Sequence, residues 1–200
     1  QAIESYVSVG ANPFSDPLAL ESTVRVARWL RTACEQGAHE QARENIGDFD
    51  PSTFDPTASF ARIGGGSLGG KARALAFVRR LLVDSDMADR FEGVHIVVPP
   101  AVVLGTDVFD RFLDDNDLRD FAMGSNDDEE IERAFVEASF PATYESDLAA
   151  FLEFMRSPLA VRSSSLLEDS QYQPLAGVYN TYMLPNNHED PDVRLRHLVR

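Results

Sequence analysis

Five glycines and the only lysine of the chain stand together in one short stretch. It reads Gly64-Gly65-Gly66-Ser67-Leu68-Gly69-Gly70-Lys71. Glycines let a backbone adopt positive φ and bring its N–H groups close to an anion, and a helix that begins after them adds the positive end of its dipole. Since 17 of the 18 basic residues are arginine, the one compact ammonium group of the protein closes this loop. The pattern indicates a phosphate site.

Known phosphate-loop patterns overlap on this stretch. Residues 64–69 fit G-x-G-x-x-G, and residues 65–71 fit the G-x-x-x-x-G-K of a P-loop. Ala72 stands where a P-loop has its magnesium-binding Ser or Thr, which argues against that class. The simplest alternative is a flexible glycine hinge followed by a solvated lysine, so the stretch alone leaves the choice open.

A second stretch, about ninety residues later, also carries phosphate-binding chemistry. It reads Leu159-Ala160-Val161-Arg162-Ser163-Ser164-Ser165, a short apolar strand that ends in an arginine and three hydroxyls. A guanidinium at a strand end forms a bidentate fork to phosphate oxygens, and serine hydroxyls bind the same group. Taken alone, an ion pair between Arg162 and Glu168 or Asp169 is the structural alternative.

Strands and helices are predicted where they would hold both stretches. A strand over 60–63 leads into the glycine loop and an amphipathic helix over 71–83 follows it, the context that a phosphate loop needs. The remaining predicted strands are 95–98, 101–104, 159–162 and 176–183. Thr106 or Asp107 is predicted to cap a helix that runs through Leu113, and a further helix is predicted to begin at Asp190-Pro191. Helices are also predicted over 127–138 and 142–156, the second with Leu148, Phe151, Leu152 and Met155 on its inward face. The acidic stretches 114–117 and 126–130 fit helix N-termini, so we assign no metal ligand.

The chain divides near residue 58 in this interpretation. Residues 1–58 are predicted to form a helical extension and a linker, because two X-Pro steps fall within 48–57. Residues 59–200 are predicted to form an α+β domain. The chain begins without Met, and we expect it to be part of a longer protein.

Composition excludes several classes of function. A net charge of −15 argues against nucleic-acid binding, since a phosphate backbone requires a basic face. No run approaches the 18 apolar residues of a membrane span. One cysteine, Cys34, excludes an intramolecular disulfide and is compatible with the cytoplasm, where we expect the protein.

Together the two stretches resemble the phosphoenolpyruvate synthase and pyruvate, phosphate dikinase family, over roughly residues 60–185. The matching motifs, in order, are Gly69-Gly70-Lys71, Val98-Pro99-Pro100, Ala160-Val161-Arg162-Ser163-Ser164, Glu168-Asp169, Ala176-Gly177 and Thr181-Tyr182. The resemblance implies the first subdomain of an ATP-grasp fold. It also implies that Gly69-Gly70-Lys71 is the part of the loop that belongs to the family motif. We interpret Gly64–Gly66 as a flexible lead-in to it.

The resemblance assigns roles to particular residues. Lys71 and Arg162 would bind the ATP phosphates and serve catalysis, and the nucleotide site would also include Gly69, Gly70, Gly177 and Thr181. The Mg²⁺ ligands and a phosphorylated histidine would lie on parts of the protein outside these 200 residues, so none of the four histidines is assigned. The implied function is phosphate transfer from ATP to that histidine and then to pyruvate or another small acceptor.

An alternative from a different class remains open. Val178 stands where the family usually has Gln, and the helical extension precedes a motif that the family places near its N-terminus. A catalytically degenerate protein that senses nucleotide or binds a partner would fit both departures. A chain of only 200 residues is expected to hold half a site and to have no activity by itself.

Overall fold

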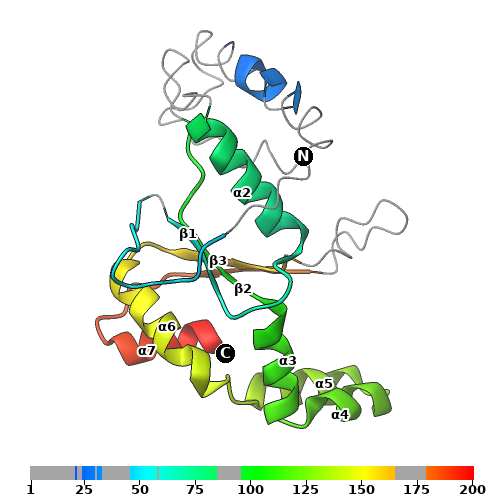
Figure 1. Ribbon diagram of the computed structural model, residues 1–200. Helices are drawn as coiled ribbons and strands as arrows, with labels where there is room; N and C mark the ends of the chain where they lie inside the picture. The colour runs from blue at the N-terminus through cyan, green and yellow to red at the C-terminus, as the bar shows by residue number, and fades with distance from the viewer. Residues whose placement is uncertain are drawn as a thin grey trace. The chain divides into compact units, whose positions relative to one another are not determined.

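The computed structural model describes residues 21, 24–29, 31–32, 46–57, 59–84, 96–164 and 179–200. The chain forms two compact units. Unit 1 comprises residues 1–46 and 71–100, and unit 2 comprises residues 47–70 and 101–200. Figure 1 shows the helices and strands of both units and labels most of them.

A parallel strand pair holds the glycine loop in unit 2. Strand β1 (Phe60–Ile63) lies beside β2 (Ala101–Leu104), with Phe60 opposite Ala101 and Ile63 opposite Leu104 (Figure 1). Helix α2 (Gly69–Asp84) separates the two strands in the sequence, which supplies the long connection that parallel strands require. The predicted strands 60–63 and 101–104 are confirmed, and α2 begins two residues before its predicted start.

The main core of unit 2 lies between β1 and helix α6 (Ala142–Phe154). Helical spacing places Leu148, Phe151 and Leu152 on one buried face, as predicted. Phe49 and Phe54 pack edge-on against each other and against Phe151, with ring centroids 5.2 to 6.4 Å apart. Segment 47–57, interpreted above as linker, therefore contributes side chains to this core; the boundary near residue 58 stays a prediction.

Three consecutive helices follow β2 along the chain: α3 (Thr106–Asp115), α4 (Leu118–Gly124) and α5 (Asp128–Glu137) (Figure 1). The α5 prediction is confirmed, since Asp127 caps it by accepting from the N–H groups of Glu129 and Glu130. The predicted cap of α3 is wrong, because Gly105 is its N-cap and no side chain caps it. Helix α4 begins directly after the acidic stretch 114–117, which was expected at a helix N-terminus, and Asp117 precedes it with a φ of 54°.

An antiparallel ribbon and a final helix complete unit 2. Strand β3 (Leu159–Arg162) pairs with β4 (Thr181–Leu184), which places Arg162 opposite Thr181. Helix α7 (Pro191–Val199) packs against α6, and the Asp190 side chain accepts from the N–H of Asp192 at its start. The helix start predicted at Asp190-Pro191 is confirmed.

Unit 1 has a smaller core of its own. Val26, Leu82 and Ile96 are buried together, and the half-buried hydrophobic residues around them are Trp29, Val78, Leu81 and Val98. The strand predicted over 95–98 is wrong at 96–98, which carry no strand in the structure. Cys34, His39 and His95 lie outside the described residues. Within the described ranges, no helix is both long and apolar enough to span a membrane.

Candidate functional site

The first half of the glycine loop is fixed against the start of α3. The N–H of Thr106 donates to the carbonyl of Ser67 at 3.0 Å, and the N–H of Asp107 donates to that of Gly65 at 3.3 Å. In return, the Thr106 hydroxyl accepts from the N–H of Ser67 at 3.0 Å. The interpretation of Gly64–Gly66 as a flexible lead-in is therefore wrong. These bonds also explain the missing side-chain cap of α3, because loop carbonyls take its first N–H groups.

The second half of the loop is fixed against the Arg-Ser-Ser stretch. The N–H of Gly70 donates to the carbonyl of Ser164 at 3.0 Å, and the Ser164 hydroxyl donates to the carbonyl of Leu68 at 2.7 Å. Gly69 is buried between them with a φ of 76°, and a Cβ built on it would overlap the Ser164 carbonyl oxygen. Only glycine combines this backbone conformation with this close approach.

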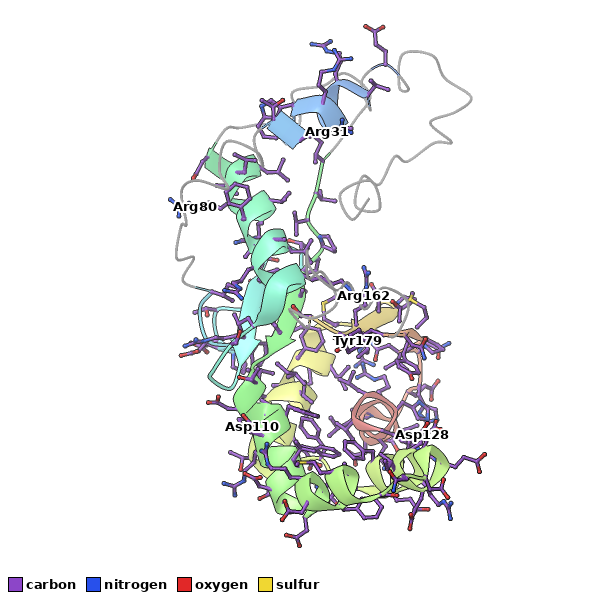
Figure 2. All side chains as sticks on the ribbon, turned by 90° about the vertical axis from the view of Figure 1, so that its right-hand side faces the viewer. Arg31, Arg80, Asp110, Asp128, Arg162 and Tyr179 are labelled. Carbon is purple, nitrogen blue, oxygen red and sulfur yellow. The ribbon has the colours of Figure 1, made fainter. Side chains whose placement is uncertain are left out.

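Ribbon pairing brings two further predicted site residues together. Arg162 ends β3 and Thr181 begins β4, directly opposite it, and both are exposed. Figure 2 shows Arg162 and Tyr179 near this end of the ribbon. Because Ser164 follows Arg162 by two residues, the contact with Gly70 anchors the chain just beyond the guanidinium.

Lys71 is the third residue of α2 and follows Gly70 directly. Its side chain is half-buried, and it is the first residue of α2 that belongs to unit 1. Unit 2 thus brings together Gly69, Gly70, Arg162 and Thr181 through Ser164 and the ribbon. Gly177, Glu168 and Asp169 lie outside the described residues.

One contact residue has a different role from the one that the sequence predicted. The Ser164 hydroxyl was expected to bind phosphate beside Arg162, yet it donates to the Leu68 carbonyl of the loop, and the Ser164 carbonyl accepts from Gly70. The hydroxyl was a visible signal in the sequence. The carbonyl was not, because every residue type has one.

Charge differs between the two halves of the loop. The Asp107 carboxylate lies directly beside Gly65 and Gly66, in the first turn of α3. An anion at that half would meet a negative charge at short range, which is unfavourable. In the part of the chain that the structure describes, no three His, Cys, Asp or Glu side chains are grouped to hold a metal ion.

These elements define an α+β domain with a glycine loop held against an arginine-bearing strand. Residues 66–198 match the family model described as "Pyruvate phosphate dikinase, AMP/ATP-binding domain". The match covers more than half of the chain, so the chain belongs to this family. The match confirms the resemblance noted from the motifs. Neither the curated proteins nor the solved structures include a match to this chain.

Proposed function

We propose that Gly69, Gly70, Lys71, Arg162, Gly177 and Thr181 form the protein's share of an ATP site. Lys71 and Arg162 bind the phosphates in this proposal, while the glycines let the backbone approach them. An ammonium and a guanidinium both neutralise the charge that phosphoryl transfer redistributes over the phosphate oxygens. The family match supports nucleotide binding by the domain as a whole.

The observation that carries the proposal is the hydrogen bond between Gly70 and Ser164. It joins the two segments that carry the proposed phosphate ligands, since Lys71 follows Gly70 and Arg162 precedes Ser164 by two residues. Two motifs far apart in the sequence therefore meet through backbone atoms that side-chain substitution cannot remove. A structural hinge would not require this anchoring.

The Asp107 carboxylate supports placing the phosphates at the Gly69–Lys71 half of the loop and not at the Gly64–Gly66 half. It repels phosphate from Gly65 and Gly66, and the loop carbonyls of that half face α3. The Gly69–Lys71 half carries the lysine and the start of α2, whose dipole favours an anion. The phosphates are thus directed to the end of the loop that the motif predicts.

The parent protein, in this proposal, is a cytoplasmic dikinase-like phosphotransferase with an ATP-grasp nucleotide domain. ATP phosphorylates a histidine on another domain, and that histidine passes the phosphate to pyruvate or another small acceptor. Mg²⁺, held by carboxylates elsewhere in the parent, would offset the charge of the triphosphate. Lys71 and Arg162 hold and orient the phosphates for the transfer.

Phosphorylation of the full-length parent by β-labelled ATP tests this function. We expect Lys71→Ala and Arg162→Ala to lose the transfer, while Arg80→Ala and Arg156→Ala retain it. Arg80 is the matched control on α2, where it is exposed and paired with Asp84; Arg156 is exposed shortly before β3. Unchanged transfer in the first two variants would overturn the assignment. A parent that binds ATP without transferring phosphate would instead support the nucleotide-sensing alternative.

A further inference from the structure

A cavity of about 170 Å³ lies in unit 2, beside the end of the β3–β4 ribbon and against α7. None of its lining residues belongs to the proposed ATP site. Its apolar wall consists of Leu159, Leu184, Pro185 and Leu198. The volume is below the roughly 300 Å³ of the smallest typical ligand pockets for drug-sized molecules, so it suits a ligand of a few heavy atoms.

Arg194 of α7 contributes a buried charge to the lining of this cavity. The residue is 2% exposed, and the hydrogen bonds of its side chain all come from one nitrogen. Nη1 donates to the carbonyls of Leu152 at 2.8 Å and Met155 at 3.3 Å, and to Oδ1 of Asn186 at 3.4 Å. Nε and Nη2 are buried and have no hydrogen-bond partner among the described residues.

Arg194 stabilises the C-terminal end of α6 through Nη1 alone and does not use Nε or Nη2 for this. The carbonyls at the C-terminal end of α6 need donors, and Nη1 supplies them together with the Asn186 side chain. Asn186 Nδ2 donates to the carbonyls of Met155 at 2.7 Å and Ser157 at 3.0 Å. Within the described ranges, no carboxylate pairs with the guanidinium. A buried cation with unused donors is strongly unfavourable unless an anion or water joins it.

Further donors lie on the cavity lining. His188 Nδ1 accepts from the N–H of Asp190 at 3.1 Å, which leaves Nε2 as the N–H donor of the neutral ring. His197 also lines the cavity, on the same helix as Arg194. Helix α7 carries two arginines, Arg194 and Arg196, and one aspartate, Asp192, so its local charge is positive within a chain of net charge −15. This arrangement would attract a small anion.

We propose that the cavity binds a small organic carboxylate. The carboxylate accepts from the unused face of the Arg194 guanidinium, with a small adjustment of the side chain, and from the imidazoles. A short aliphatic group fills the space beside the leucines. The apolar wall favours this class over inorganic phosphate, whose four oxygens would have to be stripped of water there.

Titration of the ¹⁵N-labelled 200-residue chain with propionate tests the site. We expect a saturable shift of the Arg194 Nε–H resonance with propionate, and none with propanamide, which has the same shape without the charge. Arg194→Lys should abolish saturation, and His197→Ala should weaken the affinity several-fold. Arg196→Lys is the matched control, since Arg196 is exposed on the same helix, and it should bind as the unmodified chain does.

Each other outcome overturns the proposal. Equal shifts with propionate and propanamide would show that the charge is not recognised, and tighter binding of inorganic phosphate would refute the carboxylate class. The absence of saturation would mean that water alone satisfies the guanidinium. If Arg194→Lys does not fold, His197→Ala decides, because that exposed side chain can be removed without opening the core.

Discussion

The backbone N–H of Gly70 donates to the carbonyl oxygen of Ser164 at 3.0 Å, and this bond ties the glycine loop to the strand that bears Arg162. The Ser164 hydroxyl adds a second bond to the Leu68 carbonyl at 2.7 Å. The loop is therefore held on both sides, by Ser164 at one end and by the start of α3 at the other. A phosphate site benefits from such rigidity, since the loop is then held in place before the ligand arrives.

Gly69→Ala should destabilise the protein by at least about 2 kcal/mol. The positive φ alone costs a non-glycine residue about 1–3 kcal/mol, and the new Cβ would also overlap the Ser164 carbonyl. Thermal and urea unfolding measure the change. Gly124→Ala is the matched control, because a Cβ there meets nothing within 4 Å. Equal stability of the two variants would contradict the packing described for the loop.

Ser164→Ala should cost about 1 kcal/mol of stability, the typical worth of one hydrogen bond. The substitution removes the bond to Leu68 and keeps the Ser164 carbonyl that accepts from Gly70. ATP affinity should fall several-fold, since the loop is then held by one bond fewer. Calorimetric titration with ATP measures this, with Ser157→Ala as an exposed control. Equal ATP affinity in both variants would show that Ser164 does not position the loop.

Much of the fold was predictable because local patterns specify it. The spacing of Leu148, Phe151 and Leu152 predicted the buried face of α6, and Asp190-Pro191 predicted the start of α7. Apolar runs that end at Ile63 and Leu104 predicted both strands of the parallel pair. In each case the signal lies within one element, where side-chain type reports burial directly.

The features that the sequence did not predict are contacts between distant backbones. The docking of Gly65 and Ser67 on α3 uses carbonyl and N–H groups that every residue has, so no residue type signals it. The predicted side-chain cap of α3 is absent, because the Thr106 hydroxyl accepts from the N–H of Ser67 in the loop and not from an N–H of its own helix. For the candidate site, the sequence indicated which residues belong together. The bond from the Gly70 N–H to the Ser164 carbonyl, which joins their two segments, was visible only in the structure.

Acid should weaken the turn that positions Phe54 in the core. The Ser52 hydroxyl, and secondly the Ser52 N–H, lower the pKa of Asp50 by donating to its carboxylate. The pKa of Asp50 is therefore lower in the folded protein than in the unfolded chain. The ionised carboxylate stabilises the fold at any pH above the unfolded-state pKa, and this contribution is lost as the pH falls through the folded-state pKa. The effect therefore appears below about pH 4.

Ser52→Ala should raise the pKa of Asp50 toward its ordinary value, because the larger of the two causes is removed. Carboxyl ¹³C shifts recorded against pH measure it. Thr53→Ala is the control from the same turn, since the Thr53 hydroxyl contacts the backbone carbonyl of Asp50, not its carboxylate. If both variants titrate Asp50 at the same pH, the hydroxyl is not the cause.

Lys71 offers the most direct test of the proposed ATP site, because it is the only lysine in the chain. An amine-reactive acetylating reagent modifies Lys71 and the N-terminal amine, and the latter serves as an internal reference. Peptide mapping by mass spectrometry then follows the acetylation rate of each amine with and without ATP. Adenosine, which lacks phosphate, provides the matched ligand control.

We predict that saturating ATP slows the acetylation of Lys71 about tenfold or more and leaves the N-terminal amine unaffected, while adenosine protects neither. In Arg162→Ala the protection should require roughly tenfold more ATP, as expected for losing one charged hydrogen bond to phosphate. Arg156→Ala should behave as the unmodified chain does. Acetylation of Lys71 at the same rate with and without bound ATP would contradict its role as a phosphate ligand.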